Sequence, residues 1–232
     1  MNFLINKKSK LRTINDIIDI KLEPTIESDR KKYKILIIDD EGFAQKEGLN
    51  KLGFKDIDVK FNYTTMEEYS AYDIIFCDIN GVAKEIDPYF QGAALAKKIK
   101  EMYPDKFVII FSALDQSLDF YPYYSSVDAT IIKNLNSNQL SEKLDQYIST
   151  ISNPKYKWDS IKKILESNKI PTENIAVFED FFVRSFLEGK DYTSDIKKYC
   201  QKSLKEKSEI MKKILPYVFD VMKDVVIMCV TK

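Results

Sequence analysis

The stretch Ile35-Leu36-Ile37-Ile38-Asp39-Asp40 joins an aliphatic run directly to two carboxylates. Later runs repeat this form: Ile74-Ile75-Phe76-Cys77 precedes Asp78, Val108-Ile109-Ile110-Phe111 precedes Ser112, and Thr130-Ile131-Ile132 precedes Lys133. Runs of about four to eight β-branched and aliphatic residues predict strands that are buried on both faces, as in a parallel sheet. We therefore predict an α/β fold in which the polar residues gather at the carboxyl edge of the sheet, where ligands bind in open parallel sheets.

The polar residues that end these runs are suited to Mg²⁺ and a phosphoryl group. Mg²⁺ prefers oxygen ligands, and Asp39, Asp40 and Asp78 would crowd negative charges that a cation relieves. A carboxylate at Asp78 can attack phosphorus as a nucleophile. The Lys133 ammonium and the Ser112 hydroxyl can then stabilise the charge that develops on the phosphoryl oxygens. The alternative is that each polar residue merely ends a strand, which accounts for any one of them better than for all of them together.

From about Tyr33 to Ile151 the chain resembles the receiver (CheY-like) domain of bacterial response regulators, because it has that family's order of acidic pair, acceptor Asp, Ser/Thr and Lys. The resemblance implies a flavodoxin-like, doubly wound, five-stranded parallel sheet. It also implies phosphorelay signal transduction in a two-component system, with a sensor histidine kinase or phosphotransfer protein as partner and Mg²⁺ as cofactor. The protein would then be a phosphoprotein and a switch, and not an enzyme in its own right.

The resemblance also implies a role for each site residue. Those roles are Mg²⁺ binding by Asp39, Asp40, Asp78 and the backbone carbonyl of Asn80, phosphorylation of Asp78, and response to the phosphoryl group by Ser112 and Lys133.

Three features depart from the family pattern. Asn134 stands where the family usually has Pro, Thr130 stands where it has an aromatic residue, and the loop over 81–90 is several residues longer than usual. These features favour an alternative in which the domain is a degenerate receiver that acts as a constitutive protein-interaction module.

A second alternative is a phosphatase. Asp78-Ile79-Asn80-Gly81-Val82 also resembles the first motif of haloacid-dehalogenase-type phosphatases, in which a second Asp two places on acts as acid and base. Here that position is Asn80, which cannot take this role. The acidic pair also precedes the nucleophile in this chain, whereas it follows the nucleophile in that family.

Composition narrows the remaining classes of function. Lys and Arg total 36, as do Asp and Glu, so no net charge draws the protein to nucleic acid or to a membrane. The chain has no histidine, which excludes histidine-based catalysis and means that any phosphohistidine belongs to a partner. It has three cysteines without metal-site spacing, no apolar run long enough for a membrane span and no secretory signal. We expect a cytoplasmic protein.

Three segments follow from the pattern along the chain. They are an N-terminal extension or linker over 1–32, in which 17–22 is the one candidate for a short helix or edge strand, a receiver-like domain over 33–152, and a helical output or dimerisation domain over 155–232. Within the receiver-like part we predict helices over 43–52, 91–103 and 139–151, a strand over 57–61, a stunted helix over 66–72 and a helix shortened by Pro122. The aromatic residues over 118–124 are interpreted first as core and second as a partner contact.

Apolar residues at helical spacing fill the chain after Pro154. Stripes begin near Trp158, Ile175, Ile196 and Ile214, which together predict a helical bundle that could also pair with a second chain. The lysine-rich run over 197–213 is interrupted by acidic residues and is interpreted as a solvated helix face. No helix-turn-helix pattern or cluster of acid-base residues is present, so DNA binding and an enzymatic output are not expected.

Overall fold

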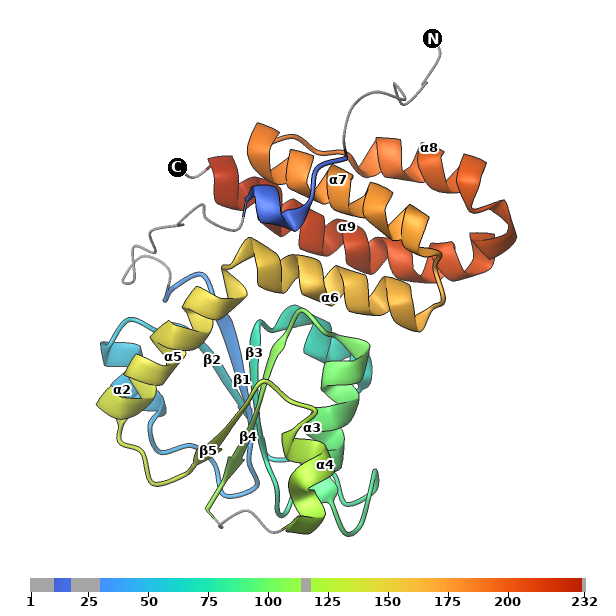
Figure 1. Ribbon diagram of the computed structural model, residues 1–232. Coiled ribbons are helices and arrows are strands. Elements are labelled where there is room, and N and C mark those ends of the chain that lie inside the picture. Colours follow the sequence, from blue (N-terminus) through green and yellow to red (C-terminus); the bar gives the residue numbers. More distant parts are fainter. Residues whose placement is uncertain (1–10, 18–29, 114–117, 231–232) are drawn as a thin grey trace. The chain divides into compact units, whose positions relative to one another are not determined.

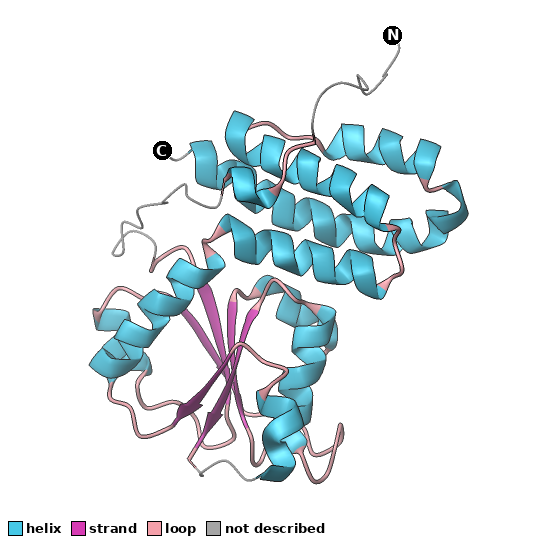
Figure 2. Ribbon diagram, in the orientation of Figure 1, coloured by secondary structure: helices cyan, strands magenta, loops and turns pink. Residues whose placement is uncertain are grey.

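The computed structural model describes residues 11–17, 30–113 and 118–230. They form two compact units (Figure 1), one made of residues 30–151 and one that joins residues 11–17 to residues 152–230. Colouring by secondary structure (Figure 2) shows that the strands belong to the first unit, whereas the second is helical. We call them the α/β unit and the helical unit.

The α/β unit is built on a five-stranded parallel sheet with the order β2-β1-β3-β4-β5. This is the flavodoxin-like, doubly wound order, and it confirms the predicted fold class. Strands β3 and β4 are buried along their whole length, as parallel strands covered on both faces should be. The strands are β1 (Lys34–Ile38), β2 (Asp56–Lys60), β3 (Ile74–Asp78), β4 (Phe107–Ser112) and β5 (Ala129–Ile132).

The crossovers of the α/β unit contain helices that are mostly close to those predicted. They are α2 (Lys46–Lys51), the 3-10 helix η2 (Met66–Ala71), α3 (Gln91–Met102), the 3-10 helix η3 (Leu118–Phe120), α4 (Tyr121–Tyr124) and α5 (Ser137–Ile151). Helix α2 begins three residues later than predicted, because Phe43 precedes it in a turn and packs its ring against Phe111. Strand β2 ends at Lys60, so the predicted inclusion of Phe61 is wrong, and Phe61 is 67% exposed.

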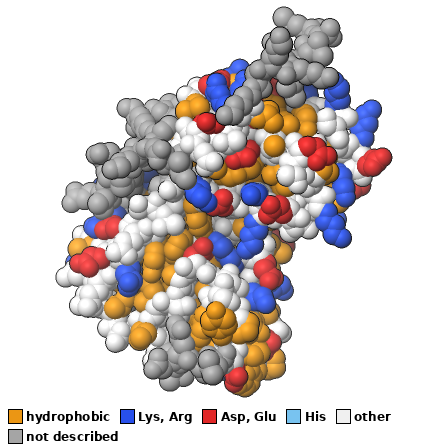
Figure 3. Space-filling view, viewed as in Figure 1, with side chains coloured by type: hydrophobic (Ala, Val, Ile, Leu, Met, Phe, Trp, Pro, Cys, Tyr) orange, Lys and Arg blue, Asp and Glu red, His pale blue; other side chains and the backbone are white. Residues whose placement is uncertain are grey.

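The aromatic residues around α4 contact one another and the loop after β3. The ring of Phe90 lies 4.5 Å from that of Tyr123 and 5.4 Å from that of Phe120. Tyr89 and Tyr121 are mostly exposed, and the space-filling view (Figure 3) shows hydrophobic side chains gathered near this end of the α/β unit. The segment is therefore neither wholly core nor wholly surface.

The helical unit consists of several helices around its own apolar core. Asn153 caps the first helix by accepting a hydrogen bond from the Lys155 N–H at 2.8 Å, and Gly189 ends the second in the left-handed region (φ 58°). Trp158 packs on Phe182 in the core, with ring centroids 5.5 Å apart. The helices are α6 (Pro154–Ser167), α7 (Thr172–Glu188), α8 (Thr193–Ser203), the 3-10 helix η4 (Lys205–Lys207) and α9 (Ser208–Val230).

Residues 11–17 contact helix α7. The backbone N–H groups of Arg12 and Ile14 donate to the carboxylates of Asp180 (2.9 Å) and Glu179 (2.8 Å), and Ile17 is only 1% exposed. This segment, with the 3-10 helix η1 (Ile14–Asp16), falls within the predicted linker over 1–32. The candidate short helix or edge strand over 17–22 lies outside the described residues from position 18 on. The proposed domain boundaries stay a prediction. In the described part of the chain, no helix is both long enough and apolar enough to cross a membrane.

Candidate functional site

The register of the sheet brings the predicted site residues to one edge. Asp39 directly follows β1, Asp78 ends β3, Ser112 ends β4 and Lys133 directly follows β5. In the sheet, Asp78 is level with Phe111, so the chain positions that carry the polar groups are neighbours across the central strands. The expected gathering at the carboxyl edge is therefore found.

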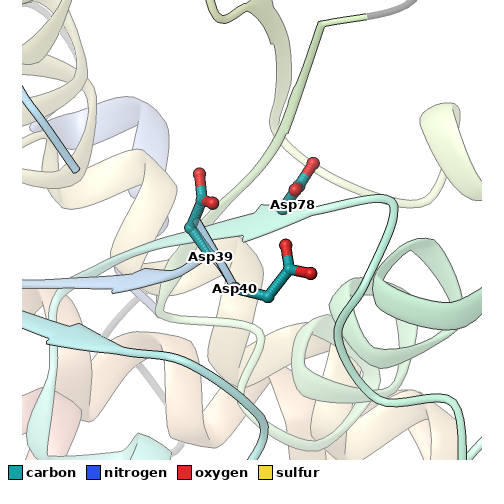
Figure 4. A group of neighbouring side chains, drawn as sticks. All are labelled: Asp39, Asp40 and Asp78. Carbon is teal, nitrogen blue, oxygen red and sulfur yellow. The ribbon is translucent and has the colours of Figure 1, made fainter. Parts of the chain in front are cut away.

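The three carboxylates form a compact cluster. One carboxylate oxygen from each of Asp39, Asp40 and Asp78 lies within 4.8 Å of the others, and their side chains are drawn together in Figure 4. Asp39 and Asp78 are buried, at 2% and 5% exposure, whereas Asp40 is exposed. The cluster thus has two buried carboxylates and one that solvent reaches.

Lys133 joins the two buried carboxylates. Its Nζ lies 2.7 Å from Oδ2 of Asp39 and 2.7 Å from Oδ2 of Asp78. The backbone N–H of Lys133 donates to the carbonyl of Ser112 at 2.9 Å, so the backbone at Lys133 is hydrogen-bonded to the last residue of β4. Ser112, which is 3% exposed, is thereby bonded through its backbone to the residue that bears the ammonium.

Burial and ion pairing act in opposite directions on these charges. Burial raises the pKa of Asp78 above its ordinary value, although hydrogen bonding and charge attraction from Lys133 work against the rise. Burial alone would lower the pKa of Lys133, but its bonds to Asp39 and Asp78 outweigh this and raise it. Lys133 is therefore held as an ammonium, and it makes an ionised Asp78 less costly.

The residues fit a divalent cation. With every group ionised, three carboxylates and one ammonium leave a formal charge of −3 + 1 = −2 at this edge, and oxygen is the ligand type that Mg²⁺ prefers. The Asp40 carboxylate lies over Gly81, where an added Cβ would come within 1.9 Å of Oδ2. Because Gly81 also has a φ of +83°, glycine suits this position for two reasons. Asp39, Asp40 and Asp78 would be the side chains that hold the ion.

The loop after β3 connects the cluster to helix α3. Asn80 is exposed, and a role for its carbonyl in metal binding stays a prediction. The N–H of Gly81 donates to the Gln91 side chain at 2.8 Å. Gly92 packs so closely on the end of β3 that an added Cβ would lie 1.7 Å from the carbonyl oxygen of Asp78. Sequence reasoning did not single out Gly92, although a glycine near the start of a predicted helix was a signal for a close contact.

The positions that depart from the family pattern can now be placed. Thr130 is half-buried within β5, and Asn134 lies in a turn directly after Lys133. The 81–90 loop is held internally, since the N–H groups of Tyr89 and Phe90 both donate to the Asp87 carboxylate, at 2.9 and 2.8 Å. None of these differences removes a residue from the charged cluster.

Comparisons with known proteins give a likeness at the level of fold. No family model matches the sequence, and no curated protein matches it. Similar solved structures include a CheY-like response regulator receiver domain protein from Methanospirillum hungatei JF-1, with 22% identity and a TM-score of 0.40, over 51% of this chain and 95% of that one. A response regulator from Thermotoga maritima has 21% identity and a TM-score of 0.38, over 50% of this chain and 98% of that one.

Proposed function

We propose that the α/β unit is the receiver of a two-component system and that Asp78 accepts a phosphoryl group with the aid of Mg²⁺. The observation that carries the proposal is the joint contact of Lys133 with Asp39 and Asp78, at 2.7 Å each, inside a cluster that also includes Asp40. The contact supports the proposal because the groups that would act as nucleophile, oxygen ligands and charge-neutralising ammonium are close neighbours.

The reaction follows from the chemistry of the acceptor. An oxygen of the ionised Asp78 carboxylate attacks the phosphorus of the donor, a new P–O bond forms, and the bond from phosphorus to the donor's leaving group breaks. A bound Mg²⁺ would supply charge neutralisation for the phosphoryl oxygens. Lys133 opposes the rise that burial causes in the pKa of Asp78, and its ammonium lies within reach of the negative charge that the phosphoryl group adds.

The buried Ser112 hydroxyl and the connection from Lys133 to β4 support a switch at the same edge. The N–H of Lys133 is bonded to the Ser112 carbonyl. A displacement of Lys133, backbone included, toward a phosphoryl group would therefore shift the end of β4 as well. In this proposal, a sensor histidine kinase or phosphotransfer protein supplies the phosphoryl group, which agrees with the absence of histidine from the chain. The helical unit is the proposed output, by binding a partner or by pairing with a second copy.

Intact-mass spectrometry tests this function. The protein is incubated with acetyl phosphate and Mg²⁺, and the expected result is one phosphoryl adduct on the parent and none on Asp78→Asn. Asp220→Asn is the matched control, because Asp220 is exposed and its contact with Lys223 is a surface pair. A folded parent that takes up no phosphoryl group would favour the degenerate receiver, and Mg²⁺-dependent turnover of phosphomonoesters would favour the phosphatase.

A further inference from the structure

A pocket with a volume of about 590 Å³ lies on the α/β unit, away from the charged cluster. Its wall is made by the segment before and within η2, by the loop after β3 and by the second half of α3. The lining residues include Tyr63, Met66, Glu67, Glu85, Ile86 and Lys98. This volume falls within the range of about 300 to 1,000 Å³ that is typical of small-molecule sites.

The pocket exists because the second crossover is short. Only residues 61–73 connect β2 to β3, and their regular part is the six-residue 3-10 helix η2. A helix of ordinary length, about 11 residues, would cover more of the flank of α3. The flank is instead left open at Met102, which is 46% exposed, while Met66 and Ile86 pack on the core beneath.

The wall combines apolar and charged groups in a way that selects for ligand charge. Met66, Ile86 and Met102 offer apolar and adaptable surface, and Tyr63, at 36% exposure, offers an aromatic ring that can face a cation. The charged groups are two carboxylates, from Glu67 and Glu85, and one ammonium.

The charged side chains of the wall have no ion-pair partners of their own. Among the described residues, Glu67, Glu85 and Lys98 form no salt bridge, although neighbouring charges do, as Lys60 does with Glu68. Two carboxylates and one ammonium give a formal charge of −2 + 1 = −1. All three groups are exposed, so water screens them in the free protein. The net negative wall still repels an anionic ligand and attracts a cation, so a monocation is the complementary ligand.

We propose that this pocket binds a small organic cation that has an apolar body, such as an alkyl or aromatic amine. The apolar body packs against the methionines and Ile86, and the cationic group lies between Glu67 and Glu85. Binding at this pocket is independent of phosphoryl transfer, since none of its lining residues belongs to the charged cluster at the sheet edge.

Calorimetric titration with three matched probes tests the proposal: 4-phenylbutylammonium, 4-phenylbutanol and 4-phenylbutyrate, each added to the full chain without Mg²⁺ or a phosphoryl donor. We expect saturable one-to-one binding of the ammonium probe, with an affinity about tenfold higher than that of the alcohol or the carboxylate, which is the combined effect of the two exposed carboxylates. Absence of saturable binding by the ammonium probe, or equal binding of all three probes, would overturn the proposal.

Variants and mapping locate the binding. Glu67→Gln/Glu85→Gln is expected to bind the ammonium probe about tenfold more weakly, because each adjacent carboxylate contributes a factor of roughly three to five. Glu101→Gln/Glu142→Gln is the matched control, since both residues are exposed and neither lines the pocket. Amide chemical-shift changes should centre on 63–67, 85–86 and 98–102. Changes centred elsewhere, or equal weakening in both double variants, would also refute the site.

Discussion

Replacing Lys133 by Met should destabilise the α/β unit strongly at neutral pH. The substitution keeps most of the side-chain volume but removes the ammonium that lies 2.7 Å from both Asp39 and Asp78. These two carboxylates have side-chain exposures of only 3% and 7%, so they would be left as a like-charged, nearly dehydrated pair.

The expected cost can be bounded from the structure. Breaking a buried ion pair by removing one partner costs about 3 to 5 kcal/mol. Lys133 has a side-chain exposure of 18%, so solvent reaches part of the site and the lower limit applies. We expect a loss of about 3 kcal/mol in the free energy of unfolding at pH 7.

The pH dependence follows from the raised pKa of Asp78. Burial already raises this pKa above the unfolded value, and loss of Lys133 removes the groups that oppose the rise. A carboxyl whose folded pKa is raised binds more protons in the folded state, so its ionisation destabilises the fold as the pH rises from the unfolded pKa through the folded pKa. The Lys133→Met variant should therefore recover stability relative to the parent when the pH is lowered through that window. Added Mg²⁺ should also restore part of the loss at pH 7.

Urea unfolding followed by circular dichroism measures these effects, with Lys212→Met as control. Lys212 is 72% exposed and forms a surface pair with Glu209, so its replacement should change the unfolding free energy by less than about 0.5 kcal/mol. A Lys133→Met variant that is as stable as the control at pH 7, and that does not respond to Mg²⁺, would show that the cluster is not held together as described.

Three further predictions concern other parts of the chain. Gly92→Ala should lower the free energy of unfolding by about 1 to 2 kcal/mol, because overpacking against the Asp78 carbonyl outweighs a gain of about 1 kcal/mol in helix propensity. Urea unfolding that shows a more stable variant would contradict this. Ile17→Ala should destabilise the helical unit by about 2 to 4 kcal/mol, as Trp158 fluorescence would report, and an unchanged unfolding midpoint would show that residues 11–17 contribute nothing. Burial raises the pKa of Cys200 to about 11, so this thiol should resist iodoacetamide at pH 8 in the native protein, and rapid labelling at Cys200 in peptide mapping would refute its burial.

The sheet and its charged edge were predictable because their signal is local. Strands β1, β3, β4 and β5 contain apolar runs, and the geometry of a parallel sheet alone places the polar residue after each run at the edge. The contacts of Lys133 with Asp39 and Asp78 then follow from strand order, which the resemblance to receiver domains supplied.

Features that depend on contacts between distant segments were not predictable. Gly92, near the start of a predicted helix, signals a close contact, but its partner, the Asp78 carbonyl, is known only once the packing of α3 on β3 is known. Likewise, Ile17 is buried by helices that follow it by more than 130 residues. The local sequence therefore predicts only a polar extension with a few apolar residues, and does not predict which helices cover Ile17. Leu187 shows the reverse case: it is an apolar residue of α7 and yet is 45% exposed, because it lies away from the helix face that carries the buried Ile175 and Phe182.

The predicted roles of the site residues rest on one chemical event, the transfer of a phosphoryl group to Asp78. The most direct measurement is peptide-level localisation of the phosphoryl group after incubation of the parent protein with acetyl phosphate and Mg²⁺. We expect a label on Asp78 alone, one that hydroxylamine removes as expected for an acyl phosphate and that does not form when Mg²⁺ is chelated. A label on another residue, or a folded protein that acquires none, would contradict it.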